Sequence, residues 1–198
     1  MKSIVLTFFA FTLSLAALAG LKPGDKAIDF KLKNIDSKEV ALSDYLKYKG
    51  VILVFTCNDC PVARAYEKRV MELDKKFAPE GYPVVAVNSN DPVMAPGDSY
   101  DKMIERAHDK GYTFPYLFDE EQTVGKTYGA MKTPHVYLLT KKKNHFEVAY
   151  VGAIDDNQRN PEDVKNAWIA KAIESLESGK TPETQETLAV GCGIKYRK

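Results

Sequence analysis

The chain has 198 residues, of which 28 are Lys or Arg and 27 are Asp or Glu, so its formal net charge is +1. Proteins that bind nucleic acid normally carry an excess of basic residues, and this balance argues against nucleic acid as a partner. The length is sufficient for one domain with a core of its own, which does not need disulfides to stay folded.

The N-terminal segment has the pattern of an export signal. Lys2 precedes an apolar run from Ile4 to Ala19 that ends in Ala17-Leu18-Ala19, a small-x-small cleavage pattern. The run is a little shorter than the roughly 20 residues of a membrane span, although an uncleaved anchor is the alternative. Cleavage after Ala19 removes one Lys and no acid, which leaves 27 of each charge. We therefore expect an exported protein, located in the periplasm of a bacterium.

The first half of the remaining chain predicts two strands, a short helical turn and one long helix. Residues 27–32 alternate in polarity, as in a strand, and residues 42–46 resemble a helical turn. The unbroken apolar run 51–56 fits a strand buried on both faces. From Pro61 to about Phe77, apolar residues recur at steps of three and four, which indicates an amphipathic helix. Those apolar residues are Val62, Tyr66, Val70, Leu73 and Phe77.

The second half predicts three strands and three helices. The predicted strands are 83–88, 135–140 and 147–151, and the last two are joined by a polar turn at 141–144. Two helices are predicted at 100–110 and 121–128. A last helix begins after Asn160 as N-cap, with Pro161 in its first position, and buries one apolar face. That face consists of Val164, Trp168, Ala172 and Leu176.

This order predicts an α/β fold with a mixed central sheet flanked by helices and an added N-terminal strand segment. The arrangement resembles the thioredoxin-like fold. We divide the chain into a signal peptide (1–19), a thioredoxin-like domain (20–178) and a C-terminal tail (179–198) that carries the third cysteine.

The most informative motif is Cys57-Asn58-Asp59-Cys60-Pro61, at the junction of a predicted strand and helix. A helix N-terminus favours an anion, so this position is expected to lower the pKa of Cys57 and to favour its thiolate. Cys60 lies about one turn further on, within the roughly 5.5 Å Cα separation of a disulfide. We expect Cys57 to attack a partner disulfide and Cys60 to displace the product, which leaves a Cys57–Cys60 bond. The alternative is a pair of cysteines that only packs or forms a static bridge.

Asp59 lies between the two cysteines, where its charge could change the redox properties of the pair. Its negative charge would destabilise the Cys57 thiolate and make the couple more reducing. An acidic residue is also favourable at a helix start, so a solvated Asp59 without influence on the thiol is the alternative.

Several segments together resemble the peroxiredoxin-like redoxin branch of the thioredoxin superfamily, which is related to alkyl hydroperoxide reductase and the thiol-specific antioxidant proteins. They are residues 24–32, 55–61, 133–136, 150–157 and 190–195. The resemblance implies that Pro134 follows a cis peptide bond, faces the cysteine pair, and together with Thr133 presents backbone to the substrate. An ordinary trans proline at a strand start is the alternative.

The resemblance to peroxidases fails at the cysteines themselves. In peroxiredoxins, Pro lies seven residues and Thr or Ser three residues before the peroxidatic Cys. The corresponding residues are Leu53 and Cys57 for Cys60, and Gly50 and Val54 for Cys57. We therefore expect thiol-disulfide exchange rather than thiol peroxidase activity, which remains the alternative.

Cys192 lies in the tail, between two glycines that allow the backbone latitude. It could fold back as an additional redox thiol, or it could remain free or pair with another molecule. A Sco-like copper chaperone is a further alternative, because Cys57, Cys60 and His135 offer soft ligands. In that family, however, three residues rather than two separate the cysteines, and we predict no metal site. We expect the acids Asp155 and Asp156 to lie in a solvated turn without a catalytic role.

The expected partners are protein or small-molecule disulfides and thiols, and no cofactor is predicted. An exported reductant would also need a membrane-linked electron donor, since that compartment is oxidising. The sequence identifies neither the substrate nor the oligomeric state.

Overall fold

The computed structural model describes residues 20–198, so the predicted export signal at 1–19 lies outside the described residues. The strands are β1 (Lys31–Asn34), β2 (Glu39–Ala41), β3 (Gly50–Phe55), β4 (Val84–Asn88), β5 (Tyr116–Phe118), β6 (Lys132–Thr133), β7 (His135–Lys142), β8 (His145–Gly152) and β9 (Cys192–Gly193). The α-helices are α1 (Pro61–Phe77), α2 (Tyr100–Lys110), α3 (Thr123–Tyr128) and α4 (Trp168–Glu177). The 3-10 turns are η1 (Leu42–Tyr45), η2 (Pro96–Asp98) and η3 (Pro161–Asp163). None of the helices in residues 20–198 is both long and apolar enough to cross a bilayer.

A seven-stranded mixed sheet forms the centre, in the order β2-β1-β5-β4-β3-β7-β8. β3, β4 and β5 are parallel, whereas β7 and β8 run antiparallel at one edge and β1 and β2 at the other. Every residue of β3 and β4 is buried, as their continuous apolar sequences require. β6 and β9 form a separate two-stranded sheet.

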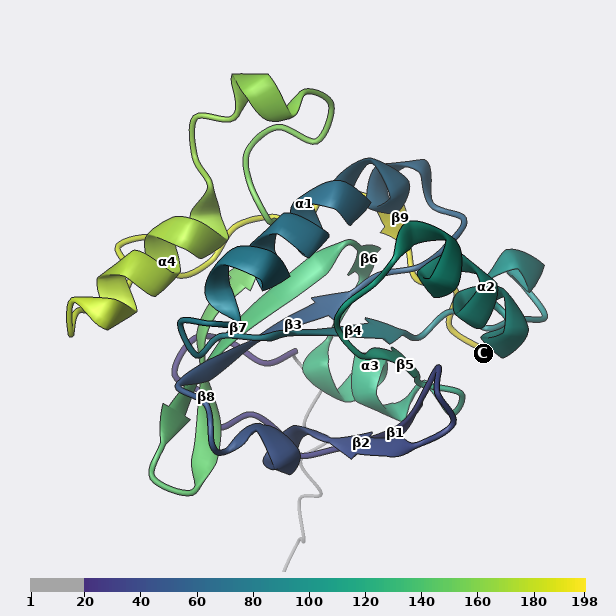
Figure 1. The fold of residues 1–198 in the computed structure, drawn as a ribbon, viewed down its shortest axis with the longest axis horizontal. Coiled ribbons are helices and arrows are strands. Elements are labelled where there is room, and N and C mark those ends of the chain that lie inside the picture. The colour runs from purple at the N-terminus through teal and green to yellow at the C-terminus, as the bar shows by residue number, and fades with distance from the viewer. Residues whose placement is uncertain (1–19) are drawn as a thin grey trace, which may run out of the picture.

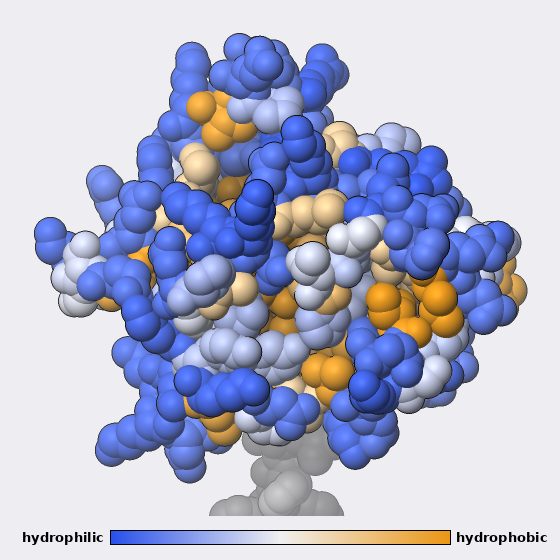
Figure 2. Space-filling model, in the orientation of Figure 1, coloured by the Kyte–Doolittle hydropathy of each residue, from blue (hydrophilic) through white to orange (hydrophobic). Residues whose placement is uncertain are grey.

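Helices cover both faces of the central sheet (Figure 1). On one face, α1, α2 and α4 bury Tyr66, Met103 and Ile169 against the sheet. On the other face, α3 and the N-terminal segment bury Tyr128 and Phe30. Alternate residues of β3 contribute to the two cores, as the two-residue period of a strand dictates. The exterior on the side shown in Figure 2 is mostly hydrophilic, with hydrophobic residues in small groups.

The predicted α/β, thioredoxin-like architecture is confirmed, and the predicted bounds of α1 and α2 are also those of the structure. The early strand is displaced, because β1 begins at Lys31 rather than Ala27. The hairpin strands extend further than predicted, so that the turn between them contains only Lys143 and Asn144. Strand β5, which was not predicted, has only three residues.

The last helix also begins later than predicted. The Asn160 side chain accepts a hydrogen bond from the Glu162 N–H, but this caps only the turn η3, and α4 begins at Trp168. The Lys165 N–H donates to the Asp156 carboxylate (3.0 Å) instead of to a helical carbonyl. This side-chain acceptor competes with the backbone and interrupts the predicted helix.

Candidate redox site

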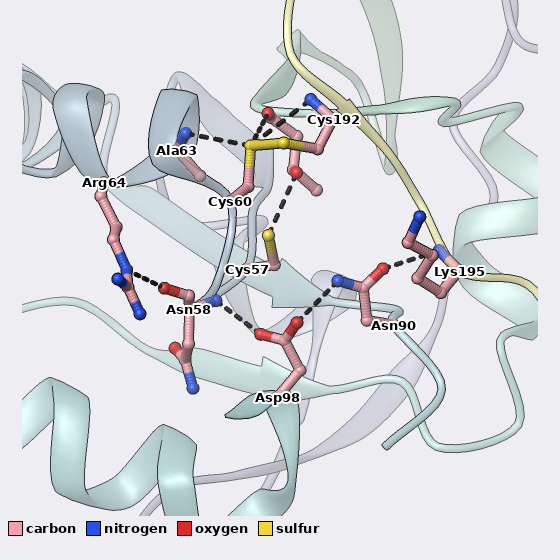
Figure 3. Close-up of a disulfide and its surroundings, with 10 residues drawn as sticks. Cys57, Asn58, Cys60, Ala63, Arg64, Asn90, Asp98, Cys192 and Lys195 are labelled. Atoms are coloured by element: carbon pink, nitrogen blue, oxygen red, sulfur yellow. Dashed lines mark hydrogen bonds between the residues drawn. A yellow bond between two sulfur atoms is a disulfide. The ribbon is translucent and has the colours of Figure 1, made fainter. Parts of the chain in front are cut away.

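The three cysteines of the chain meet at one end of the central sheet (Figure 3). Cys57 lies in the loop between β3 and α1, and Cys60 is the N-cap residue of α1. Both are buried, with 4% of each residue exposed. Cys192 comes from β9 in the tail and forms a disulfide with Cys60, across 132 residues of sequence and a Cα separation of 5.9 Å.

This pairing differs from the expected Cys57–Cys60 bond. Cys57 is a free, buried thiol, and Cys192 takes the place that the sequence analysis gave to Cys57. The sequence left open whether Cys192 folds back onto the motif, stays free or pairs with another molecule. In the structure it folds back and is bonded to Cys60. The sulfur chemistry of each cysteine remains a prediction.

The helix terminus acts on Cys60 rather than on Cys57. The Cys60 sulfur accepts hydrogen bonds from the N–H groups of Ala63 (3.5 Å) and Cys192 (3.4 Å). For Cys57, burial and then the charge of Asp98 raise the pKa, against the lowering effect of a hydrogen bond with Thr133. The predicted lowering of the Cys57 pKa is therefore wrong for this form of the protein, because the thiol is buried and lies ahead of the helix.

Asp98, from η2, is fully buried beneath the cysteine loop. Its carboxylate accepts hydrogen bonds from the Asn58 N–H (2.5 Å) and from the side-chain amides of Asn88 (3.0 Å) and Asn90 (2.7 Å). This residue was not predicted as part of the site, because it lies 40 positions beyond Asn58. Its only local signal is the turn sequence Pro96-Gly97-Asp98.

Asp59, the acid inside the motif, faces outward. Its side chain is 51% exposed and pairs with Arg64 at 3.0 Å, and Arg64 also donates to the Asn58 carbonyl. The interpretation of Asp59 as a solvated residue at the helix start therefore fits the structure better than a direct effect on Cys57.

Thr133 and Pro134 lie beside the sulfur atoms, as the resemblance implied. The peptide bond between them is cis, which confirms the predicted isomer. The Thr133 hydroxyl shares a hydrogen bond with the Cys57 Sγ (3.1 Å), and its carbonyl oxygen lies 3.4 Å from the Cys60 Sγ. Thr133 thus contacts both cysteines of the motif and is itself only 2% exposed.

His135 follows the cis proline, but it is not arranged as a metal ligand. Its Nδ1 accepts a hydrogen bond from the Met131 N–H (3.4 Å), and burial lowers its pKa to about 4. Within residues 20–198, no three His, Cys, Asp or Glu side chains gather in a metal-binding arrangement.

The acidic pair after β8 divides into a buried and an exposed residue. Asp155 is 6% exposed and accepts hydrogen bonds from Arg69 (2.7 Å) and from the Tyr66 hydroxyl (2.7 Å), whereas Asp156 is exposed. The expectation of a solvated turn is wrong for Asp155. Its partners lie on α1, 86 and 89 positions earlier, which the local sequence could not indicate.

The fold and the cysteine cluster define a thioredoxin-like redoxin. The AhpC/TSA family profile matches residues 23–155, and the chain belongs to this family. It is 30% identical over 118 residues to the thiol-disulfide oxidoreductase ResA of Geobacillus thermodenitrificans, covering 60% of this chain and 63% of that relative. The chain thus spans less than two thirds of the length of this curated relative.

Solved structures agree with this placement. An uncharacterised conserved protein from Geobacillus kaustophilus superposes with a TM-score of 0.81 at 33% identity, covering 88% of this chain and 92% of that one. A protein from Chlorobium tepidum assigned as a thiol:disulfide interchange protein DsbE gives a TM-score of 0.56 at 25% identity, covering 67% and 85%. The chain therefore has relatives and structural neighbours that are named for thiol-disulfide chemistry.

Proposed function

We propose that the protein is an exported thiol-disulfide oxidoreductase that acts through Cys57 and Cys60, with Cys192 as an additional redox thiol. Thr133 and Pro134 bind the substrate, which is a disulfide or thiol of a protein or small molecule. One observation carries the proposal: Thr133 contacts the sulfur atoms of both motif cysteines beside the cis Pro134. The names of the relatives support the same reaction class.

In the catalytic step, the Cys57 thiolate attacks one sulfur of the substrate disulfide and releases the other sulfur as a thiolate. Cys60 then attacks Cys57 and releases the reduced substrate, so the two electrons come from the protein dithiol. No organic cofactor or metal takes part in these two exchange steps. Because only sulfur chemistry is required, the three cysteines suffice.

The proposed direction is reductive. The buried carboxylate of Asp98, which accepts a hydrogen bond from the Asn58 N–H next to Cys57, supports this direction, because a nearby negative charge disfavours a thiolate in the reduced dithiol form. In an oxidising exported compartment, such a protein depends on a membrane-linked donor to regenerate its dithiol.

Trapping of mixed disulfides tests the proposed function. In the variant Cys60→Ser/Cys192→Ser, Cys57 can attack a substrate disulfide, but no second thiol of the chain can resolve the product. We expect stable Cys57-linked species, identified by nonreducing electrophoresis and mass spectrometry, with a synthetic disulfide peptide as the defined probe.

The matched control replaces Cys57 by Ser in the same background and should trap nothing. A reduced wild-type protein that leaves the probe peptide oxidised, together with no trapped species, would refute the function. If Cys57 is trapped but the wild-type protein does not reduce the probe, then Cys57 reacts as proposed and the resolving role of Cys60 is wrong.

A further inference from the structure

The tail strand β9 occupies the backbone edge of β6, the segment that leads into the cis Pro134. Lys132 pairs with Gly193 and Thr133 with Cys192, in antiparallel register. The Ile194 N–H also donates to the Met131 carbonyl (3.1 Å). Within residues 20–198, β9 is the only strand that pairs with β6. Since open strand edges bind extended peptides by strand addition, β9 lies where such a peptide would bind.

We propose that β9 is an internal occupant of a peptide-binding edge, and that Cys57 releases it by displacing Cys192 from Cys60. The vacated edge then binds an extended segment of a partner protein, such as the electron donor, whose cysteine thiol attacks the Cys57–Cys60 bond and begins its reduction. This inference rests on the proposed thiol-disulfide function and specifies both the substrate class and the regulation of that site.

The release step is a thiol-disulfide exchange within the chain. Cys57 loses its proton to solvent, and its thiolate attacks the Cys60 sulfur. The Cys57–Cys60 bond forms as the Cys60–Cys192 bond breaks, and Cys192 leaves as a thiolate that takes up a proton. The protein keeps its oxidation level, so no additional oxidant or reductant is needed. In the reverse step, Cys192 attacks Cys60, frees Cys57 and closes the tail over β6.

The contacts of the site link this exchange to the tail. Cys57 lies next to the disulfide in Figure 3, and Thr133, the pairing partner of Cys192, contacts both other sulfur atoms. A hydrogen-bonded chain also runs from the Asn58 N–H through Asp98 and Asn90 to the Lys195 N–H (Figure 3). The cysteine loop and the tail therefore share one network.

The tail is held on both sides of Cys192 by bonds that do not involve sulfur. Before it, Val151 of β8 exchanges backbone hydrogen bonds with Gln185 (2.9 Å) and Thr187 (3.0 Å). After it, the Lys195 N–H donates to the Asn90 side chain (2.7 Å). Breaking the disulfide therefore frees β9 locally while Cys192 stays near Cys60, at an effective concentration on the order of millimolar. Such a tether favours closure again after the partner leaves.

The surroundings of the tail favour a protein partner over a small polar disulfide. Seven large apolar side chains are exposed among residues 20–198, and three of them lie on segments that are hydrogen-bonded to the tail but do not move with it. Those three are Val93, Met94 and Met131. Apolar side chains flanking the cysteine of an extended segment could pack on them, in addition to the backbone bonds with β6.

Two glycines of the tail provide a matched pair of variants for a binding test. A Cβ at Gly191 would collide with the carbonyl oxygen of Thr133, whereas a Cβ at Gly193 comes no nearer than 4.0 Å to its neighbour, the Met131 carbonyl. Gly191→Ala should therefore lift β9 from β6, and Gly193→Ala should leave it in place. Cys192→Ser removes the covalent hold without adding bulk.

The binding probe is a fluorescent extended peptide with Ser at the cysteine position and Leu and Val beside it, so that it can bind but cannot react. In fluorescence anisotropy with the air-oxidised proteins, Gly191→Ala and Cys192→Ser should bind it at least about tenfold more tightly than wild type and Gly193→Ala, because a tethered competitor has been weakened. Equal affinity in all four proteins would overturn the internal-occupant proposal.

Single-turnover mapping separates this proposal from the function on which it rests. The reduced proteins receive the Cys form of the peptide as its disulfide, and acid-quenched samples are alkylated and mapped by mass spectrometry. Wild type should end with a Cys60–Cys192 bond and an alkylatable Cys57, and Cys192→Ser should stop at Cys57–Cys60. If wild type exchanges but also stops at Cys57–Cys60, the tail step is refuted and the function stands. If no protein exchanges with the peptide, the proposed function fails.

Discussion

Two carboxylates flank the free thiol of Cys57, and they differ in burial. Asp59 is half exposed and paired with Arg64, whereas Asp98 is fully buried and accepts hydrogen bonds only from neutral groups. Charges interact more strongly in the protein interior than at the surface, where water screens them. Asp98 therefore controls the protonation of Cys57 more than the acid inside the motif does.

Replacement of Asp98 by Asn should lower the pKa of Cys57, because it removes the nearby negative charge that raises this pKa. In the oxidised protein, Cys57 is the free thiol. The rate of Cys57 alkylation by iodoacetamide is measured against pH, and peptide mapping separates the Cys57 product from any Cys192 product that internal exchange allows. The wild-type rate should reach half its maximum above pH 9.0, the usual value of the group, and the Asp98→Asn profile should shift to lower pH.

Asp59→Asn is the matched control for this titration, since it removes a charge of the same kind from a solvated position. Its profile should stay close to that of wild type. A shift as large as that of Asp98→Asn, or no shift in Asp98→Asn while its circular dichroism stays native, would contradict the role of Asp98.

His135 supplies a second titration, which acts on stability. Burial lowers its pKa from 6.5 to about 4, so between these values the unfolded chain binds a proton that the folded protein does not. Stability is then complete above pH 6.5 and falls as the pH decreases toward 4, by roughly 3 kcal/mol from this residue. Urea unfolding at a series of pH values should show that acid reduces the free energy of unfolding less in His135→Gln than in wild type.

The exposed His108 provides the comparison, since 89% of its side chain is accessible. The same urea unfolding series on His108→Gln measures the effect of removing an exposed imidazole. A His135→Gln curve parallel to wild type between pH 4 and 6.5 would show that His135 does not titrate as its burial requires.

At the scale of elements, a buried ion pair connects α1 to the loop after β8. Arg69 and Asp155 lie 2.7 Å apart with side chains 10% and 5% exposed, and Tyr66 donates to the same carboxylate. Removal of Asp155 leaves the buried Arg69 charge without its counter-charge, with only the carbonyls of Asn157 and Gln158 as acceptors. We expect Asp155→Ala to reduce the free energy of unfolding by about 3–5 kcal/mol.

Chemical denaturation checks this value, with Asp156→Ala as the neighbouring control. Asp156 is exposed, and its hydrogen bonds with Lys165 and Asn166 compete with water, so its loss should reduce the free energy of unfolding much less than the loss of Asp155. Similar losses in the two variants would mean that the Arg69–Asp155 pair adds no more than a surface contact.

The elements that the sequence predicted well are those whose evidence is local. Helix α1 has a regular apolar period and Pro61 at its start, and β3 is a continuous apolar run, so both were predicted within one residue. The strands β5, β6 and β9 have two or three residues each, too few to establish a period, and exist because a neighbouring strand pairs with them.

The same limit applies to the site. The motif cysteines, Thr133 and Pro134 could be placed from their own segments. The bond between Cys60 and Cys192 spans 132 positions, and the contact of Asp98 with the cysteine loop spans 40, so neither leaves a pattern in the local sequence. Tertiary contacts rather than residue types determine which sulfur atoms pair.

For the whole molecule, the proposed chemistry depends on the compartment. A Cys60–Cys192 bond persists where no reducing buffer acts on exposed disulfides, and the sequence of residues 1–19 predicts delivery to such a place. Location and redox state should therefore change together when delivery fails.

Replacement of Leu13 by Arg tests this link, because a charge in the apolar run prevents recognition as an export signal. We express the full chain in a Gram-negative bacterium, fractionate the cells and alkylate free thiols during lysis. Wild type should appear in the periplasm with Gly20 as its first residue and with Cys60 and Cys192 protected from alkylation. Leu13→Arg should stay in the cytoplasm at full length with all three cysteines alkylated, whereas Leu13→Ile should behave as wild type. Wild-type protein retained in the cytoplasm would refute export, and periplasmic protein with alkylated Cys60 and Cys192 would show that a donor keeps the tail open there.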